Sequence, residues 1–171
     1  NLYYRNAIQT FWGRLNFAYT QSESNLISGY DFVETQPIHT WQQGERSYKL
    51  FNARGNVGKI LDAIHSNLEL NVGYSHSLYS IYQQKDIRDV RSNQGYVMFS
   101  SNTRLATWWD WELQWNSSFV HNKGYETIWN HSMGSSMTFS FGKCSFIPKL
   151  NYISNQLENG RFKSSVIVDA T

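Results

Sequence analysis

Three stretches of the chain alternate apolar and polar residues with a period of two, and their apolar positions carry large side chains. They span residues 67–77, 109–121 and 129–141. Successive side chains of a strand point to opposite faces, so each stretch predicts a long strand with one apolar and one polar face. Strands of soluble proteins usually contain about five or six residues, whereas about nine to eleven cross a bilayer when tilted. The pattern is therefore typical of a transmembrane β-barrel wall.

The apolar positions of these strands predict the surface that faces lipid. We expect the following side chains to do so: Leu68, Leu70, Val72, Trp111, Leu113, Trp115, Met137 and Phe139. In residues 94–102 large side chains occupy both parities. There we expect Val97 and Phe99, rather than Tyr96 and Met98, to point outward.

Eight strands are predicted along the chain, with no helical period between them. They span residues 10–21, 47–57, 64–77, 94–102, 109–121, 127–141, 145–155 and 161–170. This succession predicts an all-β fold, an antiparallel meander of about eight long strands that forms part of a transmembrane outer-membrane β-barrel. Pro148 fits poorly inside the seventh strand, because proline donates no ladder hydrogen bond and requires a bulge there.

The connections between these strands alternate in length. Residues 58–63, 103–108 and 142–144 are short connections, whereas residues 22–46 and 78–93 are long. Outer-membrane barrels have short periplasmic turns and long extracellular loops, so the long connections are expected outside. Loops at the outer mouth meet solutes first, which makes their aromatic residues the candidates for contact with a ligand or lid protein. These candidates are Tyr30, Trp41, Tyr79 and Tyr82.

Four charged residues share the parity that faces the barrel lumen, namely Arg14, Arg54, Glu69 and Glu112. On the lipid face, a charge near the midplane would cost about 2–4 kcal/mol, which supports this assignment. The four residues either line a substrate path or pair with one another or with a plug inside the barrel. We favour the pairing.

Composition narrows the class of protein. Charged residues make up 16% of the 171 residues, against about 25% in an ordinary soluble domain. Mean hydropathy is −0.53, and no run of about twenty apolar residues occurs, which argues against a helical membrane protein. The net charge of +2 is small and the basic residues are scattered, so no nucleic-acid partner is expected.

Candidate chemistry is sparse. No catalytic or phosphate-binding motif occurs, so we expect neither an enzyme nor a cofactor. His76 and His121 fall near the outer ends of their strands, where we favour interfacial polar residues over a metal site. The three residues Trp108, Trp109 and Trp111 predict a periplasmic aromatic girdle. The alternative is a sugar-stacking platform, which requires rings exposed in a cleft.

Several of these segments carry a family resemblance. They read SYKLFNARGN at residues 47–56, LELNVGYSHS at 68–77, LQWNSS at 113–118 and FKSSVIVDA at 162–170. Together they resemble the strand-turn-strand units of TonB-dependent receptor-like outer-membrane β-barrels, near the C-terminal end of such barrels. The resemblance covers most of residues 47–171. It consists of strand spacing and turn placement rather than a chemical motif.

The resemblance implies a barrel of about twenty-two strands with a plug domain, in the outer membrane of a Gram-negative bacterium. Such a barrel imports a nutrient, such as a glycan, a peptide or a metal chelate, with energy relayed by TonB. Plug and TonB-contacting region would precede Asn1, and the ends of the chain predict a fragment, with residues 1–171 forming one barrel segment. The implied partners are outer-membrane lipid, the plug, TonB and, in some members, a surface lipoprotein lid.

Two other functions remain open at this point. A complete eight-stranded barrel with a structural or adhesive role also fits about 170 residues. A secreted carbohydrate-binding β-sandwich would use the aromatic residues for sugars and would have shorter strands.

Overall fold

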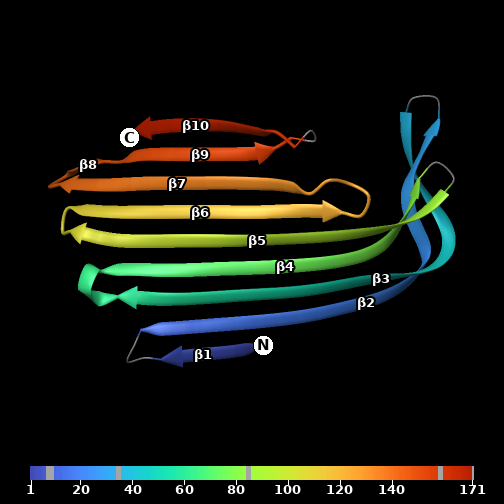
Figure 1. Ribbon diagram of the computed structural model, residues 1–171, viewed down its shortest axis with the longest axis horizontal. Coiled ribbons are helices and arrows are strands. Elements are labelled where there is room, and N and C mark those ends of the chain that lie inside the picture. Colours follow the sequence, from blue (N-terminus) through green and yellow to red (C-terminus); the bar gives the residue numbers. More distant parts are fainter. Residues whose placement is uncertain (7–9, 34–35, 84–85, 158–159, 171) are drawn as a thin grey trace.

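The computed structural model describes residues 1–6, 10–33, 36–83, 86–157 and 160–170. These residues form one antiparallel sheet in which the strands follow one another nearly in chain order (Figure 1). The strands are β1 (Leu2–Asn6), β2 (Phe11–Val33), β3 (Gln36–Leu61), β4 (Ser66–Gln83), β5 (Asp86–Ala106), β6 (Trp109–Asn122), β7 (Ile128–Phe141), β8 (Cys144–Phe146), β9 (Pro148–Gln156) and β10 (Phe162–Ala170). A single 3₁₀ turn, η1 (Asp62–Ile64), joins β3 to β4. The predicted all-β antiparallel meander is confirmed.

The sheet is open, with β1 at one edge and β10 at the other. Within the described ranges, no helix has the length and apolar character needed to cross a membrane.

The sheet contains one strand that the alternation did not predict. β1 pairs with the start of β2, from Leu2 opposite Leu15 to Asn6 opposite Phe11. Leu2, Tyr3 and Tyr4 are consecutive large side chains, so no period of two marks this strand. The predicted seventh strand is divided into β8, which pairs with β7, and β9. Pro148 is the first residue of β9, a position where strands accept proline.

The prediction that residues 22–46 and 78–93 form long loops is wrong, because the described part of both segments is paired as strands. β2 and β3 remain paired as far as Val33 opposite Gln36, and β4 and β5 as far as Gln83 opposite Asp86. Residues 34–35 and 84–85 lie outside the described residues. Strands with water on both faces need no apolar alternation, so the polar composition of these segments concealed them.

The outer part of β2 and β3 forms a hairpin arm, residues 26–33 and 36–44, that bends across the ends of β4 and β5 (Figure 1). A β-bulge between Ser24 and Leu26 marks where the arm begins. Gly29 then pairs in parallel with Tyr82. A Cβ atom on Gly29 would lie 1.6 Å from the Tyr82 carbonyl oxygen, so this close approach requires glycine.

The apolar core is located at this crossing and not in the middle of the sheet. Ile27, 3% exposed, is the buried large apolar side chain among the described residues. A Cβ atom added to Gly44 would lie 3.0 Å from Ile27 Cδ1 and 3.8 Å from Ile87 Cδ1, so the isoleucines flank this glycine closely. The broad sheet from β2 to β10 therefore has little apolar packing of its own on either face.

The register separates the side chains of the sheet into an apolar face and a polar face, because directly opposed residues share a face. Leu70 lies opposite Phe99, and Phe99 lies opposite Trp115. Val72 lies opposite Val97. Val97 and Phe99 are thus on the apolar face, as expected.

Candidate functional site: the two sheet faces and the hairpin arm

All eight side chains expected to face lipid lie on the apolar face. Leu68, Leu70 and Val72 of β4 connect through β5 to Leu113 and Trp115, and Trp111 lies opposite Met137. This face is uncovered: Leu70 is 41% and Trp115 is 40% exposed. Soluble monomers rarely leave so large a continuous apolar surface in contact with water.

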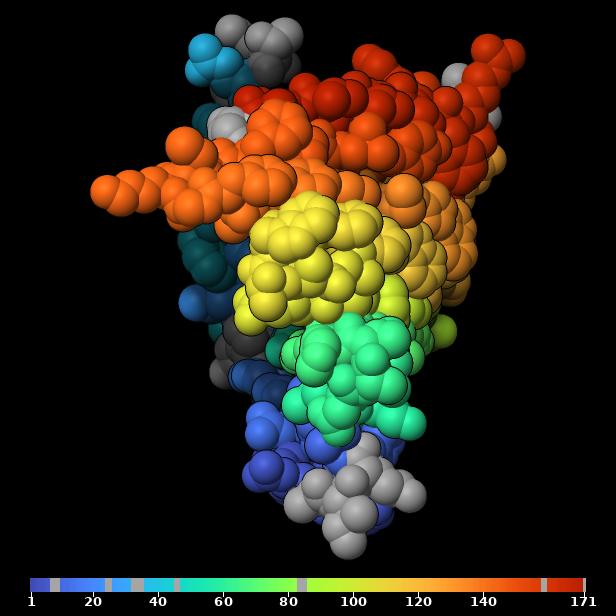
Figure 2. Space-filling model, turned by 90° about the vertical axis from the view of Figure 1, so that its left-hand side faces the viewer, coloured from blue at the N-terminus to red at the C-terminus, as the bar shows by residue number. Residues whose placement is uncertain are grey.

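An aromatic cluster bounds the apolar face at the end with the short turns. Trp108 stacks on Trp109, Phe139 and Phe141 with ring centroids 6.1, 6.3 and 5.8 Å apart. Trp109 also stacks on Phe139 at 5.7 Å, and Phe139 lies 6.4 Å from Phe146. Figure 2 looks onto this end, where the short turns appear as green, yellow and orange segments one above another.

Of the three tryptophans, Trp111 is separate from this cluster, and its indole Nε1 donates to Ser135 Oγ at 2.9 Å. In the cluster, ring faces are stacked against other rings instead of lining a cleft. The sugar-stacking platform lacks the cleft that it requires among these rings, and the girdle interpretation stays a prediction.

A second aromatic group crosses the apolar face nearer the arm. Phe119 of β6 and Trp129 of β7 are opposed, with ring centroids 5.1 Å apart. The two groups are ten residues apart on each strand, from Trp109 to Phe119 and from Trp129 to Phe139. Ten residues rise about 33 Å along a strand, or about 27 Å across a layer when the strand is tilted by 35°. Outer-membrane barrels have an apolar band about 25 Å tall between aromatic girdles.

The short turns are staggered in a regular way. The first residues of β2, β4 and β6 pair with Lys59, Thr103 and Phe139, which lie two, three and two residues before the ends of β3, β5 and β7. The line of turns therefore advances by about one residue per strand. With a rise of about 3.3 Å per residue and about 4.8 Å between strands, this corresponds to a tilt of about 35°. Strands of transmembrane barrels are tilted by about 35–45°.

The four charged residues expected in the lumen lie on the polar face. Arg54 lies opposite Asn16, Arg14 opposite Asn56, Glu69 opposite Ser100 and Glu112 opposite Asn102. In the described part of the chain no ion pair joins any two of the four. Arg54 and Glu69, an opposite-charge pair on the neighbouring strands β3 and β4, lie four residues apart along the strands, so the pairing of these charges with one another or with a plug stays a prediction.

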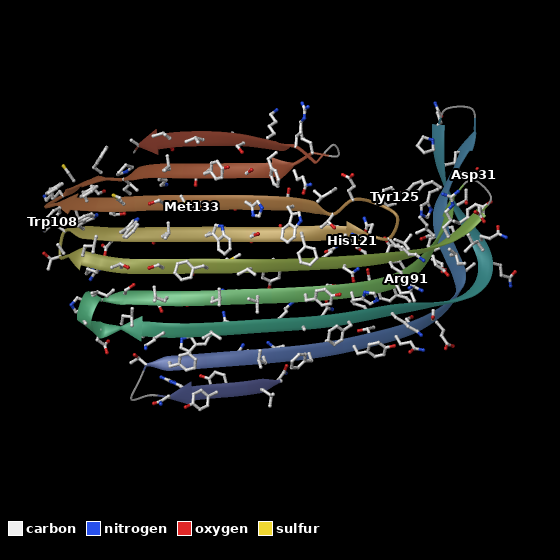
Figure 3. The ribbon with its side chains drawn as sticks, in the orientation of Figure 1. Asp31, Arg91, Trp108, His121, Tyr125 and Met133 are labelled. Atoms are coloured by element: carbon white, nitrogen blue, oxygen red, sulfur yellow. The ribbon has the colours of Figure 1, made fainter. Side chains whose placement is uncertain are left out.

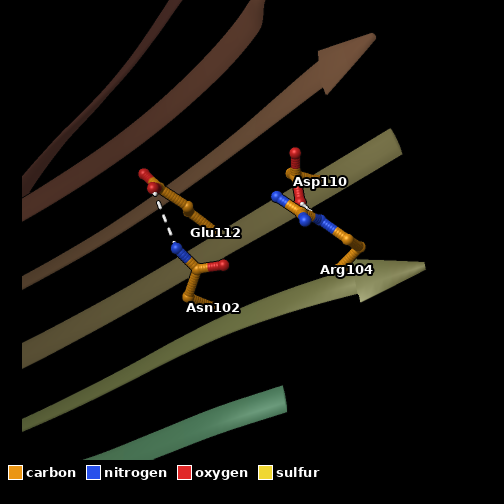
Figure 4. A network of polar contacts seen from close by, with 4 residues as sticks. All are labelled: Asn102, Arg104, Asp110 and Glu112. Carbon is orange, nitrogen blue, oxygen red and sulfur yellow. Dashed lines mark hydrogen bonds and ion pairs between the residues drawn. The ribbon is translucent and has the colours of Figure 1, made fainter. Parts of the chain in front are cut away.

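Two of the four charges contact neighbours instead. The Arg14 guanidinium lies 5.8 Å from the Tyr3 ring centroid, and Glu112 accepts a hydrogen bond from Asn102 Nδ2 at 3.3 Å. The ion pair at this end joins Arg104 Nε to Asp110 Oδ1 at 2.8 Å (Figure 4). Glu112 also lines a small hollow of about 210 Å³ with Gln114, Lys149 and Asn151. The polar face thus presents charged and amide groups to the space beside it.

The arm carries two of the four expected ligand contacts. Tyr30 and Trp41 are 56% and 61% exposed. The ring of His39 lies between them, 5.4 Å from Tyr30 and 5.1 Å from Trp41 in edge-to-face geometry. The composition of this segment gave no sign that His39 completes the group, because the pairing of Tyr30 with His39 depends on the hairpin register.

The other two expected contacts lie beneath the arm. Tyr82 is paired with Gly29, and Tyr79 lines a hollow of about 340 Å³ with Leu26, Ile27 and Tyr48. Both tyrosines are half-buried. The structure therefore gathers all four aromatic residues around one crossing, with Tyr30 and Trp41 accessible and Tyr79 and Tyr82 supporting the arm.

His76 and His121 flank Asn93 in one row of the sheet. His76 Nδ1 lies 2.7 Å from Asn93 Oδ1, and His121 Nδ1 lies 3.0 Å from Thr127 Oγ1. Each ring therefore has a polar partner of its own, and two strand spacings, about 10 Å, separate the histidines. Across the described residues, no group of three or more His, Cys, Asp or Glu is placed to hold a metal ion.

The chain matches no protein-family model, and no curated protein and no solved structure is similar to it. The resemblance to TonB-dependent receptor-like barrels therefore rests on the residue patterns alone and stays a prediction.

Proposed function

We propose that this chain is a wall segment of an outer-membrane transporter of the TonB-dependent type, which imports a nutrient such as a glycan, a peptide or a metal chelate. The observation that carries the proposal is the uncovered apolar face, bounded on β6 and β7 by aromatic groups ten residues apart. A layer of that height corresponds to the hydrocarbon core of an outer membrane.

Two further features support a barrel wall. The regular stagger of the short turns corresponds to the strand tilt of a closed barrel. The opposite face carries Arg14, Arg54, Glu69 and Glu112, as expected for a wet lumen that meets a plug or a solute. The edges at β1 and β10 have unpaired backbone groups, which cannot remain exposed in hydrocarbon. We therefore infer that further strands pair with both edges.

The alternatives have less support. A β-sandwich needs a second sheet packed about 10 Å from the first, and the described residues form one sheet. A complete small barrel needs its first and last strands to pair, whereas β1 and β10 lie at opposite edges of an open sheet.

The exposed group of Tyr30, His39 and Trp41 is the part of the proposed transporter that first meets a solute or a lid protein. The face of an aromatic ring can contact either the apolar face of a sugar or a cation. The group therefore suits the capture of a solute but does not select one nutrient class.

The test is to express the full protein in a Gram-negative host and to follow both its location and uptake. We expect it in the outer-membrane fraction. Uptake of one labelled member of a panel of oligosaccharides, peptides and metal chelates should stop when the proton gradient is collapsed. Recovery in the soluble periplasm or medium would contradict a membrane role, and uptake that survives loss of the gradient would contradict the TonB-dependent mechanism.

A further inference from the structure

The apolar face contains a hollow that is lined by both small and large residues. It has a volume of about 410 Å³ and is lined by Leu15, Gly55, Val72, Gly95, Ser117 and Trp129, among others. Gly55, Val72, Val97 and Ser117 form one continuous row across β3, β4, β5 and β6. A Cβ atom on Gly55 would lie 3.0 Å from Val72 Cγ2 and 3.2 Å from Leu15 Cδ2, so these larger side chains border the hollow closely.

Lys49 and Arg91 lie on the same face, beyond the aromatic group that contains Phe119 and Trp129, and Lys123 directly follows β6 beside Arg91. Lys49 is opposite Leu78, which is opposite Arg91. The backbone N–H of Lys123 donates to the Arg91 carbonyl oxygen at 2.9 Å. In the described part of the chain, none of these three basic side chains forms an ion pair with a carboxylate. Asp89 lies two residues before Arg91 in β5, on the same face of the sheet. Its carboxylate accepts a hydrogen bond from Ser80 Oγ at 2.7 Å.

The histidine row lies between the hollow and the basic residues. Figure 3 places His121 and Arg91 at the same end of the sheet, next to the arm. The row that contains Gly95 and Phe119 lies four residues from the row that contains Arg91, which is about 13 Å along a strand. Lysine and arginine side chains can extend back toward a membrane surface over part of this distance.

We propose that this face holds one lipid with an anionic phosphate headgroup, its acyl chain in the hollow and its phosphate at Lys49, Arg91 and Lys123. The inference rests on the proposed membrane location. Charge complementarity identifies the occupant: an apolar hollow alone would accept any acyl chain. Three basic residues about 13 Å beyond its aromatic edge, which form no ion pair in the described part of the chain, select a negative headgroup. Arg91 and Lys123 are adjacent, and Lys49 is about 10 Å away, two strand spacings across the sheet.

The test measures lipid binding to the full protein in a neutral detergent by native mass spectrometry. The probes are palmitoyl-oleoyl phosphatidylglycerol, phosphatidylcholine with the same chains, and glycerol 1-phosphate, which has the headgroup phosphate but no chain. We expect phosphatidylglycerol to bind at least about tenfold more tightly than either other probe, and its binding to weaken as salt is raised. Equal binding of both phospholipids would overturn the proposal. Glycerol 1-phosphate binding as tightly as phosphatidylglycerol would show a phosphate site without a chain site and would also overturn it.

Two variants separate the site from general attraction. K49Q/R91Q/K123Q should lose about tenfold or more in phosphatidylglycerol affinity. K59Q/K143Q/K149Q removes the same charge near the short turns and should bind as the unaltered protein does. S117F fills the hollow and should weaken binding of phosphatidylglycerol without changing its salt dependence. Equal losses in the two triple variants would overturn the proposal.

Heat-dependent gel migration and membrane fractionation of the same preparations report insertion separately. An unaltered protein that does not insert would refute the proposed function together with this site. An inserted protein without lipid preference would refute the lipid site alone. If the triple variants do not fold, the salt dependence and the lipid preference of the unaltered protein still decide the question.

Discussion

At the scale of single residues, strand parity decides what each side chain contacts. Leu70 and Glu69 are neighbours in β4, yet they lie on opposite faces of the sheet. A register shift of one residue would exchange every such pair. The assignment of side chains to the apolar or the polar face is therefore a single hypothesis that covers all strands. A test on any one strand tests the whole assignment.

Cysteine labelling of the full protein in membranes tests this parity. We expect Leu70→Cys, Leu113→Cys and Met137→Cys to react with a membrane-restricted thiol reagent. The matched neighbours Glu69→Cys, Gln114→Cys and Thr138→Cys should react with a water-soluble one, because they lie on the polar face. Labelling of the second set from lipid would mean that the apolar face is not the membrane face.

Gly29 allows a second test at the same scale. Gly29→Ala should release the arm from β4 at a cost of about 1–3 kcal/mol, because the added methyl would overlap the Tyr82 carbonyl. Faster protease cleavage within residues 26–44 would report this release. In Gly13→Ala, the added carbon meets Asn56 O at an ordinary 3.7 Å, and cleavage should not change. Equal cleavage rates in the two variants would argue against a docked arm.

At the scale of elements, each long hairpin has an inner part near the short turns and an outer part beyond them. The two parts are stabilised by different interactions. The inner parts of β2 to β7 carry the apolar face. The outer parts are held by backbone pairing and by the small core around Ile27. We therefore expect the arm to depend on the rest of the sheet, and the inner ladder to form without the arm.

Replacing residues 26–44 by a two-residue Asn-Gly turn should test this division, since such a turn closes a two-stranded hairpin. We expect the variant to keep outer-membrane location and heat-dependent migration, and to lose about tenfold in uptake or in lid binding. Tyr30→Ala combined with Trp41→Ala should reproduce most of the loss without shortening the chain. Undiminished uptake by both variants would exclude the arm from capture, and loss of membrane location would show that the arm supports the ladder.

At the scale of the whole molecule, the open edges of the sheet control assembly. β1 and β10 have no partner strand on their outer sides among the described residues. Each unpaired backbone group costs several kcal/mol in hydrocarbon, so an open sheet is not stable there.

We expect residues 1–171, refolded alone in detergent, to show no heat-dependent shift in gel migration. The full protein should show the shift, because the further strands that we propose would cover both edges. A shift with residues 1–171 alone would mean that β1 and β10 close on each other or on a second copy. The complete small barrel would then become the preferred function.

The sequence by itself determined which strands have one apolar and one polar face. Alternation in residues 67–77, 109–121 and 129–141 predicts β4, β6 and β7 and the side on which their large residues lie, because a period of two is a local property of extended backbone. The parity of Arg14, Arg54, Glu69 and Glu112 followed from the same property. The interruption before Pro148 was likewise foreseeable, because it depends on one missing N–H group.

The tertiary structure alone decided how these strands meet. Pairing extends β2 to β5 far beyond their apolar parts, and no local pattern marks strands with water on both faces. Contacts between distant segments, such as Gly29 with Tyr82 and Tyr30 with His39, depend on the bulge and on register. The stagger of the turns and the row from Gly55 to Ser117 arise in the same way. Strand alternation is encoded in neighbouring residues, whereas register is set by hydrogen bonds between segments that the sequence does not place together.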